Sequence, residues 1–185
     1  MDWINILDHE CFSWVQQYMR HPMLDYWFVL FRDKHTWIPL YVFLLSFLFF
    51  NYGKEAWKVL LMCILLITIT DQLNSNLIKK SVQRQRPCNE SFFNETYQAA
   101  IDCSGGYSFP SSHATNHMGL AVFLFLWFRK SLWRHFLLLW AALVGFSQVY
   151  VGVHFPFDVM AGFMEGAIIA FVLYSIYIKF FAKNN

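Results

Sequence analysis

Five apolar stretches, separated by polar turns, limit what this chain of 185 residues can fold into. The stretches cover residues 36–51, 56–80, 112–128, 135–150 and 157–181. Each is long enough, alone or with its flanking residues, to cross the roughly 30 Å hydrocarbon core of a bilayer as a helix. Only 14% of the residues are charged, whereas a soluble domain carries roughly 25%. The sequence therefore predicts one all-α integral membrane domain over residues 1–185, a bundle of five to six transmembrane helices.

The N-terminal region differs from these stretches because charged residues interrupt it. Apolar residues between positions 3 and 19 recur at three- and four-residue steps, as in an amphipathic helix at a membrane interface. A second apolar segment follows at 23–31, but Arg20 and Asp25 argue against one simple span. We therefore expect interfacial or re-entrant helices over 3–34; a helix that binds a partner protein is the alternative. The chain starts without a basic region, so no cleavable signal peptide is expected.

The basic residues divide between two sides of the predicted bundle. The loop 81–110 and the connection 151–157 fall on one side when the crossings are counted. The other side carries Lys54, Lys58, Arg129, Lys130, Arg134, Lys179 and Lys183. The positive-inside rule makes this second side cytoplasmic, so the loop side faces outward. A formal net charge of only +2 gives no reason to expect a nucleic-acid partner.

Four basic residues remain on the outward side and need another explanation: Lys79, Lys80, Arg84 and Arg86. Binding an anion is one explanation, and snorkelling of long side chains to lipid head groups is the alternative. Lys79 and Arg86 are seven residues apart, and Pro87 ends the local helix, so both side chains can reach one anion. Arginine would offer a planar fork of donors and lysine a point charge.

The outward loop also holds Cys88 and Cys103. An outward position permits a disulfide between them, and two free thiols are the alternative. The four cysteines of the chain show neither a Cys-x-x-Cys pair nor a Cys/His metal spacing.

Two more polar clusters border apolar stretches. Serines in Pro110-Ser111-Ser112-His113 would leave backbone N–H groups free at a helix start, where the helix dipole favours an anion. His154 and Asp158 stand four residues apart, on one face if a helix begins there. An imidazole held by a carboxylate at a membrane surface indicates nucleophilic chemistry.

Each cluster has a structural alternative. The serines could act only as a helix cap, and His154 could be a packed or capping residue. His113 and His117, four residues apart, could hold a metal, although no third ligand is evident. Convergence of all the clusters on one membrane face favours a shared site, because each alternative would have to hold independently.

The motif spacing resembles the type 2 phosphatidic acid phosphatase (PAP2) superfamily of membrane lipid phosphatases, whose motifs are KxxxxxxRP, PSGH and SRxxxxxHxxxD. Here the motifs are Lys79-KSVQRQ-Arg86-Pro87, Pro110-Ser111-Ser112-His113 and Ser147-Gln148-VYVGV-His154-FPF-Asp158. Two residues depart from the pattern: Ser112 replaces a glycine, and Gln148 replaces an arginine. The second departure removes a permanent positive charge, which Arg84 could supply instead. On this view, Gln148→Arg would preserve or raise turnover.

The resemblance implies a site and a reaction. His154 would attack phosphorus and become a phosphohistidine, Asp158 would orient it, and His113 would protonate the leaving oxygen and then activate water. The implied phosphate-binding residues are Lys79, Arg86, Ser111, Ser112 and Gln148, with Arg84 as an auxiliary cation. No metal and no cofactor are expected, because cationic side chains would stabilise the charge. Glu165, on the same face of the last helix as Asp158, is expected to pair with a polar group such as Asn116 or His117.

The resemblance also implies a place and a class of substrate. We expect a bacterial inner (cytoplasmic) membrane protein whose active site faces the periplasm. Its substrate would be undecaprenyl diphosphate, a lipid A phosphate or phosphatidylglycerophosphate, with the first two favoured. A lipid phosphotransferase with the same intermediate and a catalytically weak lipid-binding protein are the alternatives. The sequence predicts no oligomeric state.

Overall fold

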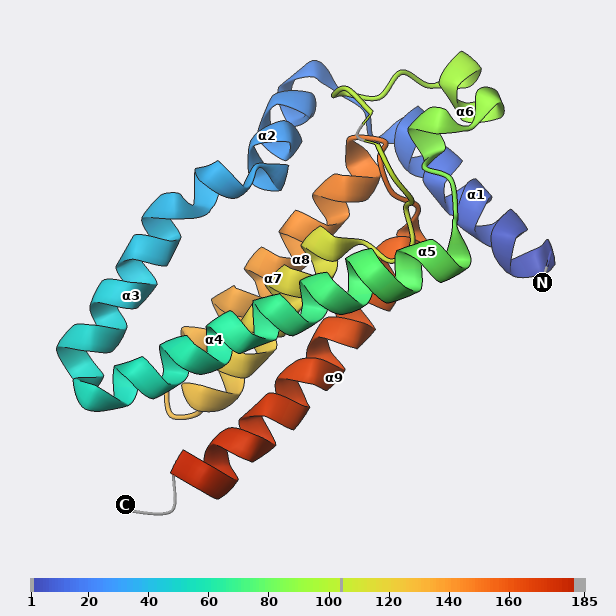
Figure 1. Ribbon diagram of the computed structural model, residues 1–185. Helices are drawn as coiled ribbons and strands as arrows, with labels where there is room; N and C mark the ends of the chain where they lie inside the picture. The colour runs from blue at the N-terminus through green and yellow to red at the C-terminus, as the bar shows by residue number, and fades with distance from the viewer. Residues whose placement is uncertain (1, 104, 182–185) are drawn as a thin grey trace.

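The computed structural model describes residues 2–103 and 105–181, and Figure 1 shows their arrangement. These residues form helices and no β-strand, so the all-α prediction is confirmed. The α-helices are α1 (Asp2–Tyr18), α2 (Pro22–Arg32), α3 (Ile38–Tyr52), α4 (Lys54–Gln72), α5 (Lys79–Val82), α6 (Ser91–Thr96), α7 (Ser112–Trp127), α8 (Arg134–Tyr150) and α9 (Pro156–Phe181). Two 3-10 turns and a π-helical segment join them: η1 (Lys34–Trp37), η3 (Pro87–Asn89) and η2 (Leu73–Ile78).

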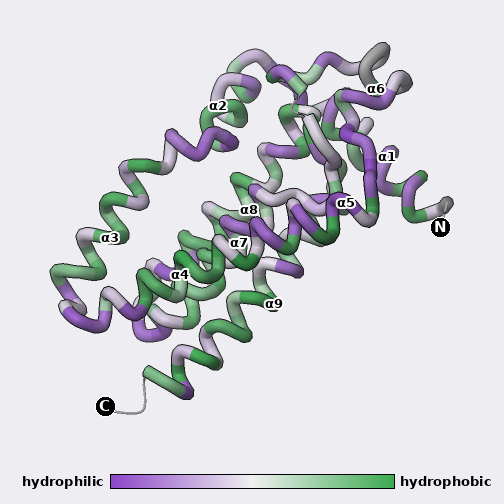
Figure 2. Tube along the Cα trace, viewed as in Figure 1, coloured by the Kyte–Doolittle hydropathy of each residue, from purple (hydrophilic) through white to green (hydrophobic). Residues whose placement is uncertain are grey.

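Three described helical segments are long and apolar enough to cross a membrane: Lys34–Tyr52, Lys54–Val82 and Pro156–Phe181. α7 and α8 occupy the two remaining apolar stretches of the sequence. In Figure 2, apolar residues predominate along α3, α7 and α9, whereas hydrophilic residues gather around α5, α6 and the α3–α4 turn. The chain is therefore a membrane protein, and the count of five to six spans stays a prediction.

α7 lies at the centre of the bundle and packs against α4, α8 and α9. Fully buried apolar side chains from all four helices meet in one cluster, among them Leu66 of α4, Phe123 of α7, Val144 of α8 and Ala170 of α9. Because lipid tails are as apolar as these side chains, the association of the helices depends on close packing.

Glycines bring the backbones of α7 and α9 together. A Cβ built on Gly162 of α9 would lie 2.7 Å from the carbonyl oxygen of Ser111, and one on Gly166 would overlap the carbonyl of Thr115. Small residues at such a seam let two helices approach closely. The backbone N–H of Ser111 also donates to the carbonyl oxygen of Asp158 at 3.0 Å. The start of α7 is thereby fixed beside the start of α9.

The bundle has two distinct ends (Figure 1). The α3–α4 turn, the α7–α8 turn and the last turn of α9 lie at one end, with the basic residues that the sequence assigns to the cytoplasm. Of those residues, Lys183 lies outside the described part of the chain. The loop between α5 and α7 and the connection between α8 and α9 lie at the opposite end, together with α1 and α6.

A second apolar cluster lies at this loop end. Phe12 of α1, Phe93 of α6 and Phe155 of the α8–α9 connection contact one another, with ring centroids 5.1 to 5.6 Å apart. All three side chains are buried, as are Tyr150 and Val151 beside them. The cluster fastens the N-terminal helix over the connection that carries His154.

Most of the predicted apolar face of α1 points away from the rest of the protein, although Val15 is buried. Leu7 and Trp14 are 43% and 56% exposed, whereas Asp8 and Gln16 on the opposite face are buried. Polar residues are buried there because α1 contacts polar groups of the loop end: Gln16 Nε2 donates to the carbonyl oxygen of Val149 at 2.9 Å. An outward apolar face suits a helix that lies in a membrane interface, which stays a prediction.

The N-terminal region is divided into two helices by an ion pair. Arg20 donates to both carboxylate oxygens of Asp25, at 2.9 and 3.2 Å, and the hydroxyl of Tyr150 donates to Asp25 at 2.8 Å. Pro22 begins α2 between the two charged residues. The charges that argue against a single span therefore stabilise the break between α1 and α2.

α4, η2 and α5 form one continuous helix from Lys54 to Val82. Gln83 ends it in the left-handed conformation, with φ at 53°. Pro87 then disfavours helical geometry at Arg86, whose φ of −80° and ψ of 148° are extended. The chain thus leaves the helix at Gln83, one turn after Lys79, and is extended at Arg86.

The π-helical segment η2 changes which side chains face inward. Asn74 is buried, whereas Gln72 and Ser75 are exposed. A π turn holds more residues than an α turn, so this segment shifts the positions of the side chains that follow it around the helix axis.

Candidate functional site

His154 is buried in the connection between α8 and α9, with 2% of its surface exposed. Nη1 of Arg86 lies 3.1 Å from its Nε2. Arginine can only donate, so Nε2 accepts and Nδ1 carries the ring proton. Nδ1 lies 3.5 Å from Oδ2 of Asp158, which is longer than an ordinary hydrogen bond. Burial above all lowers the pKa of His154 to about 4, so its imidazole is neutral at neutral pH.

The carboxylate of Asp158 is held in place in the first turn of α9. It is fully buried, and its Oδ2 accepts the backbone N–H of Phe155 at 2.9 Å. Its Oδ1 accepts Nη1 of Arg84 at 2.8 Å. The N-terminus of a helix favours a negative charge, which suits a carboxylate at this position.

Arg84 lies between two carboxylates. Its Nη2 forms an ion pair of 2.7 Å with Asp8 of α1, and its guanidinium stacks 4.1 Å from the ring centre of Phe155. Asp8 in turn accepts the backbone N–H of Phe157 at 2.8 Å. The charge of Arg84 is therefore compensated by Asp8 and Asp158, and its role as an auxiliary phosphate-binding cation stays a prediction.

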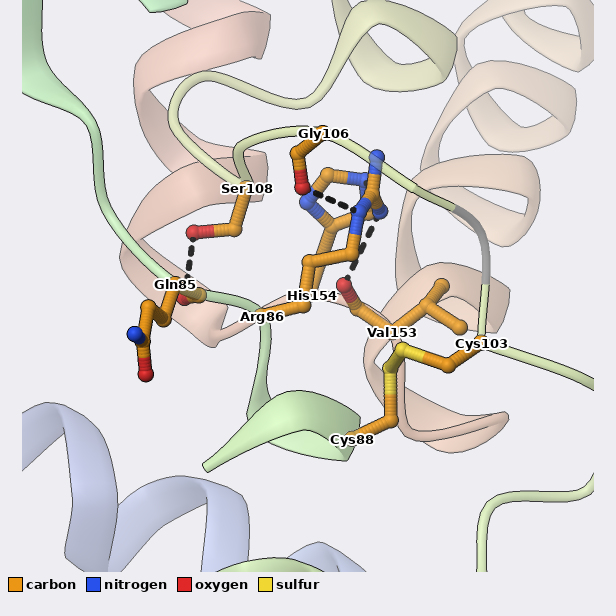
Figure 3. Close-up of a disulfide and its surroundings, with 8 residues drawn as sticks. All are labelled: Gln85, Arg86, Cys88, Cys103, Gly106, Ser108, Val153 and His154. Carbon is orange, nitrogen blue, oxygen red and sulfur yellow. Dashed lines mark hydrogen bonds between the residues drawn. A yellow bond between two sulfur atoms is a disulfide. The ribbon is translucent and has the colours of Figure 1, made fainter. Parts of the chain in front are cut away.

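Figure 3 shows how Arg86 is held beside His154. Besides its contact with the imidazole, Arg86 donates to the carbonyl oxygens of Val153, at 3.2 Å, and Gly106, at 3.3 Å. Cys88 and Cys103 are joined by a disulfide, with Cα atoms 5.8 Å apart. The bridge begins two residues after Arg86 and ends three residues before Gly106, so it closes the loop around the guanidinium.

Lys79 and His113 complete the mouth of the bundle from α5 and α7. The Lys79 side chain is half-buried, and neither its ammonium group nor the His113 ring makes a hydrogen bond or ion pair within the described residues. The ring nitrogens of His117 are both engaged: Nδ1 lies 2.8 Å from the carbonyl oxygen of His113, and Nε2 lies 3.2 Å from the hydroxyl of Tyr41. His113 is thus the ring on α7 with open nitrogens.

The two serines of the second motif have different positions. Ser111 is the N-cap of α7: its hydroxyl lies 3.5 Å from the Ala114 N–H, and its own N–H donates to Asp158. The expectation that the Ser111 N–H group is free for an anion is therefore wrong. Ser112 and His113 stand in the first helical turn, where backbone N–H groups lack partners within the helix.

Gln148 is fully buried on α8 and contacts a residue that no motif contains. Its Oε1 accepts Nε of Arg32, in the last turn of α2, at 3.2 Å. Sequence reasoning missed Arg32 because it lies 116 residues away from Gln148 in a region without a motif. The available signal was a basic residue at the end of a short apolar segment.

A cavity of about 530 Å³ opens beside His113, between η1, α3, α4 and α7. Leu120 and Ile67 supply apolar walls, and Asp71 and Lys34 supply charges at its border. The mixture of apolar and charged walls suits an amphipathic ligand.

Glu165 of α9 forms no hydrogen bond with Asn116 or His117. Asn116 instead donates to Asp71 at 2.8 Å and accepts the hydroxyl of Thr70 at 2.6 Å, and His117 contacts Tyr41. The expected pairing of Glu165 with Asn116 or His117 is wrong.

The sequence of this chain is similar to known membrane enzymes. A family model described as the PAP2 superfamily matches residues 56–182. The chain is 34% identical over 168 residues to the lipid A 4'-phosphatase of Bacteroides thetaiotaomicron. This alignment covers 88% of this chain and 73% of that protein. The chain is 36% identical over 140 residues to the undecaprenyl-diphosphatase of Sulfolobus acidocaldarius, which covers 75% of this chain and 62% of that protein.

The fold is also similar to a solved structure. The crystal structure of a transmembrane PAP2 type phosphatidylglycerolphosphate phosphatase from Bacillus subtilis superposes with a TM-score of 0.75. The superposition covers 97% of this chain and 89% of the other, at 25% sequence identity.

Proposed function

Because this chain belongs to the PAP2 superfamily, we propose that it removes a phosphate group from a lipid A phosphate in the membrane. Its relatives are named as lipid phosphatases, which supports the reaction class. Lipid A is favoured because the relative of that name matches 88% of the chain, against 75% for the undecaprenyl-diphosphatase. Undecaprenyl diphosphate and phosphatidylglycerophosphate are the alternative substrates.

The buried imidazole of His154, between a donor and a carboxylate, is the observation that carries the proposal. Its unprotonated Nε2 lies 3.1 Å from Arg86, so a phosphate bound to that guanidinium would be next to the nucleophile. Nε2 attacks phosphorus, the bond between phosphorus and the lipid oxygen breaks, and protonated His113 gives its proton to that oxygen. The anionic phosphate favours the protonated form of His113 in the complex.

The second step releases the phosphate. His113, now neutral, takes a proton from a water molecule that attacks phosphorus. The bond between phosphorus and Nε2 breaks, so inorganic phosphate leaves and His154 is neutral again. Asp158 faces the Nδ1 proton in both steps, and its negative charge balances the charge on the phosphorylated ring.

Cationic side chains and backbone N–H groups bind the phosphate oxygens. Lys79 and Arg86 supply the charges, and the N–H groups of Ser112 and His113 supply donors at the N-terminus of α7. These donors stabilise the charge of the transition state, so the reaction proceeds without a metal ion.

The cavity beside His113 receives the leaving group. Its mixture of walls supports an amphipathic lipid in which a polar head group meets His113 while apolar chains extend along Leu120. The proposed position of His113, between this cavity and His154, gives it access to the leaving oxygen.

We further propose that the protein lies in the inner membrane with its site facing the periplasm. The disulfide beside Arg86 supports this, because disulfides persist in oxidising compartments such as the periplasm. The basic residues at the opposite end of the bundle support it too, because cytoplasmic loops carry an excess of lysine and arginine.

Phosphate release from a panel of lipids tests the function. The purified protein in detergent would be given lipid A, undecaprenyl diphosphate and phosphatidylglycerophosphate, with EDTA present to remove metal ions. We expect release from lipid A above all, and its loss in His154→Ala. His135→Ala is the matched control, because His135 is an exposed histidine at the opposite end of the bundle and should leave turnover unchanged.

Samples with lipid radiolabelled in its phosphate, quenched in detergent at alkaline pH because a phosphohistidine is labile in acid, would reveal the intermediate as label bound to the protein in wild type and absent in His154→Ala. Phosphorylation of an added lipid acceptor in place of phosphate release would favour the phosphotransferase. A wild-type protein that releases phosphate from no lipid in the panel would contradict the proposed function.

A further inference from the structure

Gln148 stands where the family pattern has an arginine, and among the described residues its amide nitrogen donates only within its own helix. Its amide is fully buried, and Nε2 lies 3.4 Å from the carbonyl oxygen of Val144 in its own helix. Oε1 faces Nε of Arg32, since only the oxygen of the amide can accept from arginine. Gln148 therefore holds the guanidinium of Arg32.

Two donor groups of Arg32 have no partner among the described residues. The contact with Gln148 occupies Nε, and the two Nη groups make no hydrogen bond or ion pair anywhere in residues 2–103 and 105–181. The neighbouring carboxylate of Asp33 is directed to His35 instead, whose N–H it accepts at 3.0 Å. Both Nη groups are thus available to an anion.

The guanidinium of Arg32 is beside the proposed reaction centre. The carbonyl oxygen of Gln148 accepts the backbone N–H of His154 at 3.2 Å, and the Gln148 side chain accepts from Arg32. Gln148 therefore contacts both Arg32 and the residue that carries the nucleophile. Burial, and after it the charge of Arg32, lower the pKa of Arg86, so the two guanidinium groups interact.

The balance of charged groups around the site favours the binding of an anion. Asp8 and Asp158 compensate Arg84, whereas no described carboxylate lies within ion-pair distance of Arg32, Lys79 or Arg86. These three cations, none of which forms an ion pair within the described residues, repel one another, and a phosphate dianion would relieve that repulsion.

A simpler role for Arg32 is to stabilise the C-terminus of α2 or to reach lipid head groups. Either of these roles would require only an exposed positive charge. It does not explain why a fully buried glutamine accepts from Nε of Arg32, at the motif position that carries the charge in the family pattern.

We propose that Arg32 is a phosphate-binding residue, which supplies from α2 the positive charge that the family pattern places at position 148, and that Gln148 positions it. This rests on the proposed function and adds to it a residue from outside the three motifs. With Nε held by Gln148, both Nη groups can bind phosphate oxygens as a planar fork.

An exchange of the two residues tests the proposal. Arg32→Gln should lower kcat/KM for the lipid phosphate about 10- to 100-fold, the usual effect of losing a hydrogen bond from a charged group. Arg32→Lys should retain part of the activity, because it keeps the charge and loses the fork. The double variant Arg32→Gln, Gln148→Arg keeps one arginine and one glutamine in the same space and should recover at least about 10-fold over Arg32→Gln.

Gln148→Arg alone would place a second guanidinium against Arg32 in a buried position. We therefore expect this variant to be less active than wild type, which revises the expectation from sequence. Arg129→Gln, an exposed arginine at the opposite end of the bundle, is the control and should keep wild-type kcat/KM.

Binding of inorganic phosphate gives a readout that does not depend on catalysis. Phosphate should raise the unfolding midpoint of wild type, because a ligand that binds the folded state stabilises it. The rise should be lost in Arg32→Gln and return in the double variant, with chloride at equal ionic strength as the reference.

The outcomes separate the two proposals. Wild-type protein that hydrolyses no lipid yet shows this phosphate pattern would contradict the function and support the role of Arg32. Wild-type kcat/KM and phosphate binding in Arg32→Gln would overturn the role of Arg32 and leave the function standing. Loss of phosphate binding in Arg32→Gln and Arg32→Lys without recovery in the double variant would also overturn it.

Discussion

The two ring nitrogens of His154 face chemically opposite neighbours: a guanidinium that donates to Nε2, and a carboxylate opposite Nδ1. This asymmetry selects one tautomer, with the lone pair toward Arg86 and the proton toward Asp158. The nucleophile is thus oriented before any substrate arrives.

Asp158→Asn tests whether the carboxylate serves this orientation. The amide keeps the shape of the side chain but loses the charge that faces Nδ1 and pairs with Arg84. We expect kcat to fall by about 100-fold or more, as when a carboxylate that orients a catalytic histidine is replaced. Asp33→Asn, at an exposed cap, is the control. More than half of the wild-type kcat in Asp158→Asn would contradict the role.

The low pKa of His154 leads to a second prediction, about how the folding stability depends on pH. Folding lowers this pKa from about 6.5 to about 4, so the ring takes up a proton only as the pH falls through about 4. Between these values the unfolded state binds the proton first, and His154 therefore lowers the folding stability progressively as the pH falls from about 6.5 to about 4. Nitrogen NMR of labelled histidines, assigned with His154→Ala, would measure the midpoint. A midpoint at or above 6.5 would show that burial does not control the ring.

The limits of sequence reasoning are visible among these residues. Spacing within a motif brings His154 near Asp158, because four residues make one helical turn. It says nothing of Arg84, which lies between two carboxylates, or of Arg32, which approaches Gln148 across 116 residues. Contacts of that kind depend on how the helices pack, and no local pattern records them.

At the scale of elements, the seam between α7 and α9 sets the geometry of the site. Ser111 at the start of α7 is bonded to Asp158 at the start of α9, and glycines let the two backbones approach below them. Apolar periodicity and length predict that both helices exist, as the structure bears out. Which face of α7 meets α9 depends on side-chain volumes along both, which a single sequence does not resolve.

Gly166→Ala tests this seam. The added methyl group would overlap the carbonyl of Thr115, so the two helices would have to separate. We expect a destabilisation of about 1–3 kcal/mol and a fall in kcat, because His113 would move relative to His154. Thermal unfolding in detergent and the turnover of the same sample would measure both effects. Gly105→Ala meets no atom within 4 Å and is the matched control.

At the scale of the molecule, charge and cysteine chemistry separate the two ends of the bundle. The disulfide lies at the loop end, and most of the basic turns lie at the other. The sequence predicts this division between the two ends. The apolar stretches mark the membrane crossings, and counting the crossings tells which loops lie on the same side. The bridge could not be predicted, since the cysteine spacing fits free thiols equally well.

Labelling of intact cells tests the proposed orientation. Single cysteines would be placed at Gln98, in the loop, and at Lys130, in the α7–α8 turn, after Cys11 and Cys63 are changed to serine. Both target positions are exposed. We expect a membrane-impermeant maleimide to label position 98 in intact cells and position 130 only after lysis. The reverse pattern would place the site in the cytoplasm.

The family model matches this chain from residue 56, yet two of the charges that converge on the site come from the 55 residues before it. Asp8 shares Arg84 with Asp158, and Arg32 meets Gln148. A fragment cut to residues 56–182 would retain every motif and lose both partners. We therefore expect the smallest working unit to be longer than the stretch that the family model matches.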